Sequence, residues 1–239
     1  MQDSKRLNPR RWFILPKWEN LPSDIRNDAV RPYYDALRRH RAGLFFKRVF
    51  DVIASLVLIL ILGIPMIIIA IMIKCDSKGP VFFRQERVTS YGARFMIHKF
   101  RTMVNNAEKQ GTSVTVGNDV RITKAGAKLR DHRLDEFPQV FDVLAGNMSF
   151  VGTRPEVVKY VDRYSDEMMA TLLMPAGITS IASIEYKDEA ALLENASDAD
   201  EVYVKDILPA KMEYNLKSVK EFNFFRDIGV LFKTVSAIF

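Results

Sequence analysis

The chain has 239 residues, of which 48% are hydrophobic, and it carries a formal net charge of +6. A hydrophobic content near one half supports a sizeable core and excludes wholesale disorder. The single cysteine, Cys75, excludes an internal disulfide framework and a multi-cysteine metal site.

The positive charge is concentrated before residue 49. Residues 1–48 hold twelve Lys or Arg and five Asp or Glu, a net of +7, and subtracting this from +6 leaves −1 for residues 49–239. A basic arm of this kind binds either nucleic acid or anionic lipid. The sequence that follows the arm decides between the two.

A long apolar segment follows the basic arm. Residues 52–73 read VIASLVLILILGIPMIIIAIMI and contain no charged residue. At helical rise they cover about 33 Å, enough for a bilayer core of about 30 Å. A buried core helix is the alternative, but uncharged runs of this length are rare in soluble folds. We therefore predict a membrane segment and no nucleic-acid partner.

Two features of this segment argue against a simple crossing of the membrane. Gly63 and Pro65 lie in its middle, where proline removes a backbone donor and produces a kink or a break. Both flanks are basic, and positive charge marks the cytoplasmic side of a membrane segment. A bent, re-entrant helical hairpin broken at Pro65 places both ends in the cytosol, so we predict this form. A spanning helix that tolerates its proline is the alternative.

The whole chain predicts an α+β fold that is dominated by helices. Residues 1–46 are a basic N-terminal extension, which is either an amphipathic helix on the membrane surface or a solvated linker. Residues 47–74 are the predicted re-entrant membrane helix. Residues 75–239 are a predicted cytosolic, membrane-associated catalytic domain.

Within the catalytic domain, sequence periodicity predicts a few local elements. Two apolar-rich runs that flank TSYGA predict a small β-hairpin. Residues 102–118 predict a short helix followed by a polar loop. AGAKLRDHRLDEFPQVFDVLAG predicts two helical pieces, VGTRPE and MPAGIT predict tight turns, and residues 208–239 predict one or two amphipathic helices.

Asp135 and Glu136 form an adjacent acidic pair. Pro138 places the pair at the start of a helix, because proline is tolerated in the first helical turn and costly later. Free N–H groups and partial positive charge at a helix start favour carboxylates and phosphates together. One carboxylate can attack a phosphorus while the other holds Mg²⁺. Ordinary helix capping is the alternative role of both residues.

Cationic side chains are dense on both sides of this pair. The guanidinium group of arginine can donate two parallel hydrogen bonds to phosphate oxygens, so the set of cations predicts a phosphate site. Each residue taken alone is explained equally well as a solvated surface residue or a salt-bridge partner. The candidate substrate-binding residues are Lys99, Arg101, Arg121, Arg130, Arg154 and Pro155.

An ordered series of motifs runs through most of the chain. It consists of KRVFD, the proline-interrupted apolar segment, SKGPVFFRQERV, HKFRTM, DVRITKAGAKLR, LDEFPQVFDVLAGNMSFVG, RPE and PAGIT. In this order the motifs resemble those of the monotopic phosphoglycosyl transferases of the bacterial sugar transferase family, from about Lys47 to the end. The resemblance implies a re-entrant helix in the bacterial inner membrane and a catalytic domain on the cytosolic face.

The resemblance also implies a reaction. Asp135 would attack the β-phosphate of a UDP-sugar and release UMP, and polyprenyl (undecaprenyl) phosphate would then take the sugar-phosphate from the aspartate. Glu136 would help to hold Mg²⁺. Lys99 and Arg130 fall where the family places phosphate contacts, and Arg154 falls in the motif assigned to the nucleotide.

The chain departs from the family pattern in two places. Thr153 stands where the family commonly has a proline, and the chain has PAGIT where a common form has PGIT directly. These departures leave the identity of the sugar open. The competing hypothesis is a non-catalytic, membrane-anchored scaffold of a polysaccharide assembly complex, which needs the apolar segment but not an acidic pair among cations.

Overall fold

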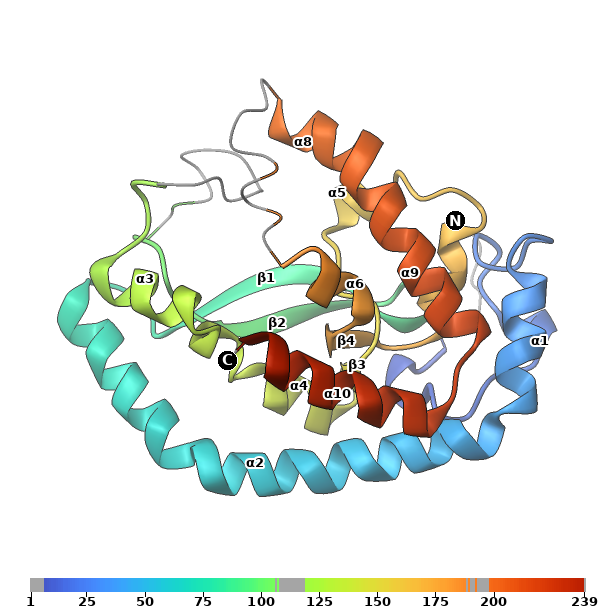
Figure 1. Cartoon of the computed structure of the whole chain (residues 1–239), viewed down its shortest axis with the longest axis horizontal. Helices are drawn as coiled ribbons and strands as arrows, with labels where there is room; N and C mark the ends of the chain where they lie inside the picture. The colour runs from blue at the N-terminus through green and yellow to red at the C-terminus, as the bar shows by residue number, and fades with distance from the viewer. Residues whose placement is uncertain are drawn as a thin grey trace.

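The structure is a computed structural model and describes residues 7–105, 107, 119–187, 189, 192 and 198–238. Helices dominate it, with two small sheets, in agreement with the predicted α+β class (Figure 1). Most of the helix and loop predicted for residues 102–118 lies outside the described residues. The elements in chain order are η1 (Pro9–Arg11), η2 (Trp18–Asn20), α1 (Arg31–Arg39), α2 (Arg41–Asp76), β1 (Phe82–Val88), η3 (Ser90–Gly92), β2 (Arg94–Phe100), α3 (Lys124–Asp131), η5 (Leu134–Glu136), α4 (Gln139–Ala145), β3 (Met148–Val151), α5 (Val158–Val161), η6 (Met168–Leu173), β4 (Ala176–Thr179), α6 (Ile181–Glu185), α8 (Ala199–Val202), η7 (Tyr203–Ile207), α9 (Leu208–Lys220) and α10 (Phe224–Ile238).

The predicted β-hairpin is confirmed as β1 and β2. The two strands pair antiparallel, from Phe82 opposite Phe100 to Val88 opposite Arg94. Their connection, η3, places both Tyr91 and Gly92 in the left-handed region, with φ of 59° and 71°. Glycine adopts this conformation without strain, which explains the glycine in the loop. The two predicted helical pieces and the C-terminal amphipathic helices are likewise confirmed, as α3, α4, α9 and α10.

The second sheet was not predicted from the sequence. β3 and β4 pair in parallel. Of the two tight turns expected there, VGTRPE begins on the last residue of β3, and MPAGIT contains the whole of β4. Gly152 and Gly177 lie side by side just where the strands meet, and a Cβ on Gly177 would be 2.1 Å from the Gly152 backbone nitrogen. Both glycines therefore serve close approach of two backbones rather than a turn.

The apolar segment forms a single long helix, α2, which is longer at both ends than the predicted segment 47–74. Pro65 lies inside the helix, so the predicted break is absent. The helix is curved, and its two ends turn toward the rest of the protein (Figure 1). Its first part packs beside α4 and its last part beside α3 and β2.

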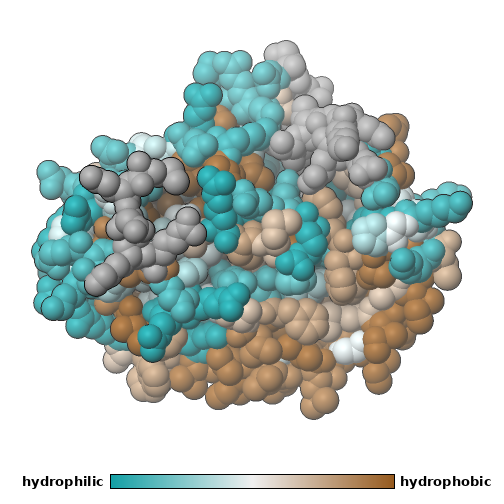
Figure 2. Space-filling model, turned by 180° about the vertical axis from the view of Figure 1, so that it is seen from behind, coloured by the Kyte–Doolittle hydropathy of each residue, from teal (hydrophilic) through white to brown (hydrophobic). Residues whose placement is uncertain are grey.

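The middle of α2 contacts the protein core only through partly buried side chains, which are Leu58, Ile59 and Leu62. Ser55 and Met66 are both buried, whereas every residue between them is partly or fully exposed. Only 17% of the most apolar 18-residue window is buried, which argues against a core helix of a soluble fold. Figure 2 shows the resulting hydrophobic band along the edge of the molecule that α2 forms.

The N-terminal extension is part of the folded core in its described residues. Trp12 is buried, and α1 buries Tyr33, Tyr34 and Leu37 in the same cluster, together with residues of η6 and α9. The apolar face of α1 is thus turned to the protein. Neither of the two forms considered for the extension, a surface-lying amphipathic helix or a solvated linker, describes this packing.

Candidate active site

Three separate segments bring charged side chains to Glu136. Lys99 comes from the end of β2, Glu136 from η5, and Arg154 from the chain just after β3. Lys99 Nζ donates to Glu136 Oε1 at 2.8 Å, and Arg154 donates to the same oxygen at 2.7 Å. Glu136 is buried, and both cations approach one of its oxygens, which leaves Oε2 outside both contacts.

The turn that carries the acidic pair has an unusual backbone. Arg133, directly before η5, is held at φ 52°, a conformation that non-glycine residues seldom adopt and that is common at functional sites. Pro138 is the N-cap of α4. Asp135 therefore lies in its own 3₁₀ turn before α4, rather than at the start of that helix as the sequence predicted, because Pro138, which has no N–H, itself occupies the N-cap.

The two carboxyls of the pair differ in their protonation. Burial disfavours ionisation of Glu136, but the charges of Arg154 and Lys99 outweigh it and hold the pKa of that carboxyl well below its usual range. The pKa of Asp135 is raised, first by burial and then by the Glu136 charge, although Lys99, Arg130 and Arg154 act in the opposite direction. Asp135 is thus the more basic carboxyl of the two.

The cations respond to the same environment. Burial lowers the pKa of Lys99, while the Glu136 charge opposes this shift. The Glu136 charge raises the pKa of Arg154. The Arg154 side chain is still 34% exposed, so it faces both the buried carboxylate and solvent. We call Lys99, Arg130, Asp135, Glu136 and Arg154 the dyad cluster.

Helix α4, which follows the acidic pair, is fixed from both sides. The Asp142 carboxylate accepts from the His98 backbone N–H and from His98 Nδ1, each at 2.8 Å. Arg84 always donates, so its contact with Nε2 assigns the proton to Nδ1 and gives His98 a structural role between β1 and α4. Arg48 of α2 donates to the last carbonyls of α4, at Val143 and Leu144.

The segment from Arg154 to Glu156 is held by groups that the sequence did not single out. Arg87 donates to the Pro155 carbonyl at 3.0 Å. The hydroxyl of Tyr203 donates to Glu156 Oε1 at 2.6 Å, and Lys211 Nζ donates to that hydroxyl at 3.2 Å. Lys211 also pairs with Glu189 at 2.7 Å. We call Glu156, Glu189, Tyr203 and Lys211 the Tyr203 network.

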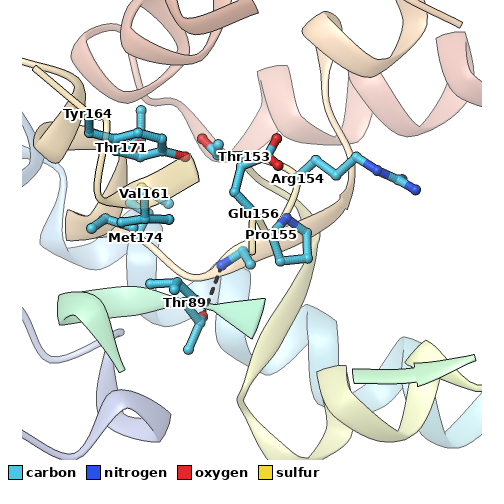
Figure 3. Close-up of a pocket in the computed structure, with 12 residues that line it drawn as sticks. Thr89, Thr153, Arg154, Pro155, Glu156, Val161, Tyr164, Thr171 and Met174 are labelled. Atoms are coloured by element: carbon cyan, nitrogen blue, oxygen red, sulfur yellow. Dashed lines mark hydrogen bonds between the residues drawn. The ribbon is translucent and has the colours of Figure 1, made fainter. Parts of the chain in front are cut away.

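Figure 3 shows the hollow beside this segment. Tyr164, Thr171 and Met174 line one side of it, and the side chain of Arg154 extends away from it. Arg154 thus lines part of the hollow, while its guanidinium group reaches out of it to Glu136. No pattern along the sequence links Glu156 to Tyr203, 47 residues later, so only the fold reveals the contact.

The other predicted substrate-binding residues form no direct contact with Glu136 within the described part of the chain. Arg101 donates to the Ser77 and Lys78 carbonyls at the C-terminal end of α2, at 2.8 and 2.6 Å. Arg121 contacts the Asp119 carboxylate and the Ala107 carbonyl. Arg130 belongs to the dyad cluster through its effect on Asp135, and Pro155 contributes its carbonyl to Arg87.

The dyad cluster has the donor chemistry of a magnesium site that is completed by substrate. Within the part of the chain that the structure describes, no group of three or more His, Cys, Asp or Glu side chains surrounds a common point. A Mg²⁺ ion commonly binds one or two carboxylates, with substrate phosphates and waters as its other ligands. Asp135 and Glu136, with Glu136 Oε2 outside the ion pairs, fit this requirement.

Comparison with known proteins gives a consistent result. Residues 42–239 match the model of the bacterial sugar transferase family. The chain is 34% identical over 197 residues to UDP-N-acetylgalactosamine-undecaprenyl-phosphate N-acetylgalactosaminephosphotransferase of Aeromonas hydrophila, a match covering 81% of this chain and 44% of that protein. It is 32% identical over 227 residues to UDP-glucose:undecaprenyl-phosphate glucose-1-phosphate transferase of Klebsiella pneumoniae, covering 93% of this chain and 46% of that protein.

A shorter relative extends the same pattern. UDP-glucose:undecaprenyl-phosphate glucose-1-phosphate transferase of Caulobacter vibrioides is 31% identical over 195 residues, which cover 80% of this chain and 69% of that protein. The chain spans less than half the length of the first two relatives. The family match, the relatives and the order of the motifs agree, and the chain belongs to the bacterial sugar transferase family.

Proposed function

We propose that the protein transfers a sugar-1-phosphate from a UDP-sugar to polyprenyl phosphate, as the first membrane step of polysaccharide or glycoconjugate synthesis. The observation that carries this proposal is the dyad cluster, in which a raised-pKa carboxyl lies beside a carboxylate already paired with two cations. The names of the relatives, which are undecaprenyl-phosphate sugar phosphotransferases, support the same substrate classes.

The proposed reaction has two displacements. An oxygen of Asp135 attacks the β-phosphorus of the UDP-sugar, the bond between that phosphorus and the bridging oxygen breaks, and UMP leaves. An oxygen of polyprenyl phosphate then attacks the same phosphorus, the bond to Asp135 breaks, and polyprenyl diphosphate sugar is formed. Dividing the transfer in this way uses one phosphate site twice.

Asp135 is assigned as the nucleophile because Glu136 is already committed to Lys99 and Arg154. The raised pKa of Asp135 makes its carboxylate the better attacking group of the two. Arg130 and Arg154 would bind phosphate oxygens of the donor, and Lys99 would keep Glu136 in place. Glu136 would help to hold Mg²⁺, which supplies charge neutralisation of the diphosphate when bound.

We place α2 in the bacterial inner membrane as a re-entrant helix with both ends on the cytosolic face. Its mostly exposed middle, its curvature and its basic flanks support this placement. The sole cysteine, Cys75, is exposed near one end of α2 and provides a test. In intact cells, an impermeant maleimide should fail to label Cys75, and should equally fail to label an Ala42→Cys/Cys75→Ser variant until the membrane is permeabilised. Labelling of either end from outside would refute the re-entrant form.

A direct assay tests the reaction. Purified protein with polyprenyl phosphate, Mg²⁺ and a panel of UDP-sugars should release UMP with at least one donor. Omitting the lipid and weighing the intact protein should reveal a sugar-phosphate adduct that maps to Asp135. An active preparation that never carries the adduct would overturn the covalent mechanism. A protein that stays bound to membranes but releases no UMP from any of the UDP-sugars would favour the scaffold hypothesis.

A further inference from the structure

Two helix–helix corners pack against each other at one edge of the molecule. The first, residues 38–48, joins α1 to α2, and the second, residues 217–227, joins α9 to α10. A Cβ on Gly43 would lie 3.2 Å from the ring of Phe222, so the Gly43 backbone packs closely against that ring. Lys47 and Asp227 form a 2.6 Å ion pair between the corners, and Lys47 is buried there. We call the two segments the paired corners.

The outer surface of the paired corners is aromatic. Phe45, Phe46 and Phe225 are 53%, 57% and 79% exposed. Phe45 and Phe46 lie in the N-terminal part of α2, and Phe225 lies at the start of α10, which packs against α2. Exposed aromatic residues beside an apolar face are characteristic of segments that lie at the boundary between lipid headgroups and acyl chains.

The same surface is strongly basic. Residues 38–48 contain five Lys or Arg and no Asp or Glu, and residues 217–227 contain three Lys or Arg and two Asp or Glu, so the two segments carry +5 and +1. The acidic residues of the second segment are used in ion pairs, Glu221 with Arg226 and Asp227 with Lys47. Across the described ranges, the exposed side chains of Arg38, Arg39 and Arg41 form no ion pair.

We propose that the paired corners bind the headgroups of anionic phospholipids, with Arg38, Arg39 and Arg41 contacting phosphates. Phe45, Phe46 and Phe225 would insert into the adjacent interfacial layer. Clustered arginines next to a membrane segment attract acidic headgroups because the surface potential of such a bilayer is negative. The proposal goes beyond the transfer reaction and rests only on the placement of α2 in the membrane.

Fluorescence quenching by brominated lipids tests the proposal on the full chain. A Phe225→Trp variant is reconstituted in phosphatidylcholine vesicles that contain a minor fraction of phosphatidylglycerol, with either lipid brominated. After subtraction of the parent signal from Trp12 and Trp18, brominated phosphatidylglycerol should quench the introduced indole about twofold more, per mole of brominated lipid, than brominated phosphatidylcholine. High salt should reduce this preference.

Charge variants in the same Phe225→Trp background identify the responsible residues. Arg38→Gln/Arg39→Gln/Arg41→Gln should lower the ratio to one. The matched control, Lys159→Gln/Arg163→Gln/Lys205→Gln, removes the same charge from exposed positions on the side of the molecule away from α2 and should keep the preference (Figure 1). Circular dichroism verifies that each variant is folded.

The outcomes are distinct. Equal quenching by the two lipids, quenching by neither, or an unchanged preference in the arginine variant would each overturn the proposal, and so would loss of the preference in the control variant. UMP release is measured separately. A silent enzyme that retains the lipid preference would count against the transfer reaction and leave the lipid site standing.

Discussion

Two buried charge networks meet on the short segment from Arg154 to Glu156, and they are organised differently. In the Tyr203 network, the Tyr203 hydroxyl and the Lys211 ammonium group both donate to other groups of the protein. Tyr203 donates to Glu156 and accepts from Lys211, which pairs with Glu189. Burial and the neighbouring carboxylates raise the pKa of Tyr203, so its hydroxyl stays protonated and continues to donate.

The dyad cluster is left open by comparison. Three cations, Lys99, Arg130 and Arg154, influence two carboxylates, and the two direct contacts both go to Glu136. Buried charge is costly unless it is paired, so a surplus of positive charge is best explained by an anion that arrives later. The closed network stabilises the fold, whereas the open one leaves charge available for the phosphate groups of the proposed reaction.

The largest effect is expected from Asp135→Asn. Turnover should fall by about 10³-fold or more, because the attacking oxygen is lost. The melting temperature should rise. The pKa of Asp135 is raised in the folded state, so its ionisation opposes folding above that pKa, and an amide removes this opposition at neutral pH. UMP release and thermal unfolding measure the two effects, and a variant that loses activity and stability together would contradict the assignment.

Arg154→Lys tests whether Arg154 binds phosphate through the geometry of its guanidinium group or only through its positive charge. Lysine keeps the positive charge but loses the planar fork, so kcat/KM for the UDP-sugar should fall by about 10- to 100-fold. Arg163→Lys, an exposed position outside the cluster, is the control and should behave like the parent. Unchanged kinetics in Arg154→Lys would mean that this arginine acts only through its charge on Glu136.

Glu136→Gln gives a pH signature. The folded pKa of Glu136 is depressed, so its ionised form contributes stability that is present above the unfolded pKa of about 4.3 and is lost as pH falls toward the lower folded value. The variant should be less stable at neutral pH by about 1–3 kcal/mol, because Lys99 and Arg154 lose their charged acceptor. Thermal unfolding across this acidic range should be flatter in the variant than in the parent. Parallel curves would contradict the ion pairs.

Local pattern was sufficient for the elements that are local. The hairpin β1–β2 has its two strands adjacent in the sequence. Pro138 predicted a helix boundary beside the acidic pair, but the separate 3₁₀ turn that carries the pair was missed. The parallel pair β3–β4 was missed because its strands have four residues each and pair across 24 residues of intervening chain. Glycines that allow two backbones to touch there have the same sequence signature as glycines in turns.

The sequence could not predict which side chains of the site, distant along the chain, contact one another in the fold. Arginines 101, 121, 130 and 154 look alike along the chain, and only the fold separates the two in the dyad cluster from Arg101, which caps α2, and Arg121, which pairs with Asp119. In the N-terminal extension, a pattern of apolar residues that predicts a buried helix was overlooked when the net charge was considered. Tyr33, Tyr34 and Leu37 follow Pro32 at helical spacing, which is the pattern of a buried helix face.

The smallest effect is expected from Tyr203→Phe, and it tests whether the two networks are separate. The change leaves Glu156 and Lys211 each without one partner, so stability should fall by about 1–3 kcal/mol and the melting temperature by a few degrees. The kcat/KM should change less than about threefold, since the hydroxyl contacts neither the dyad nor Arg154. A loss of kcat/KM as large as that of Arg154→Lys, in protein that is still folded, would show that the Tyr203 network positions the arginine. The proposed distinction between the closed Tyr203 network and the open dyad cluster would then fail. Both sets of residues would affect binding of the UDP-sugar through the segment from Arg154 to Glu156.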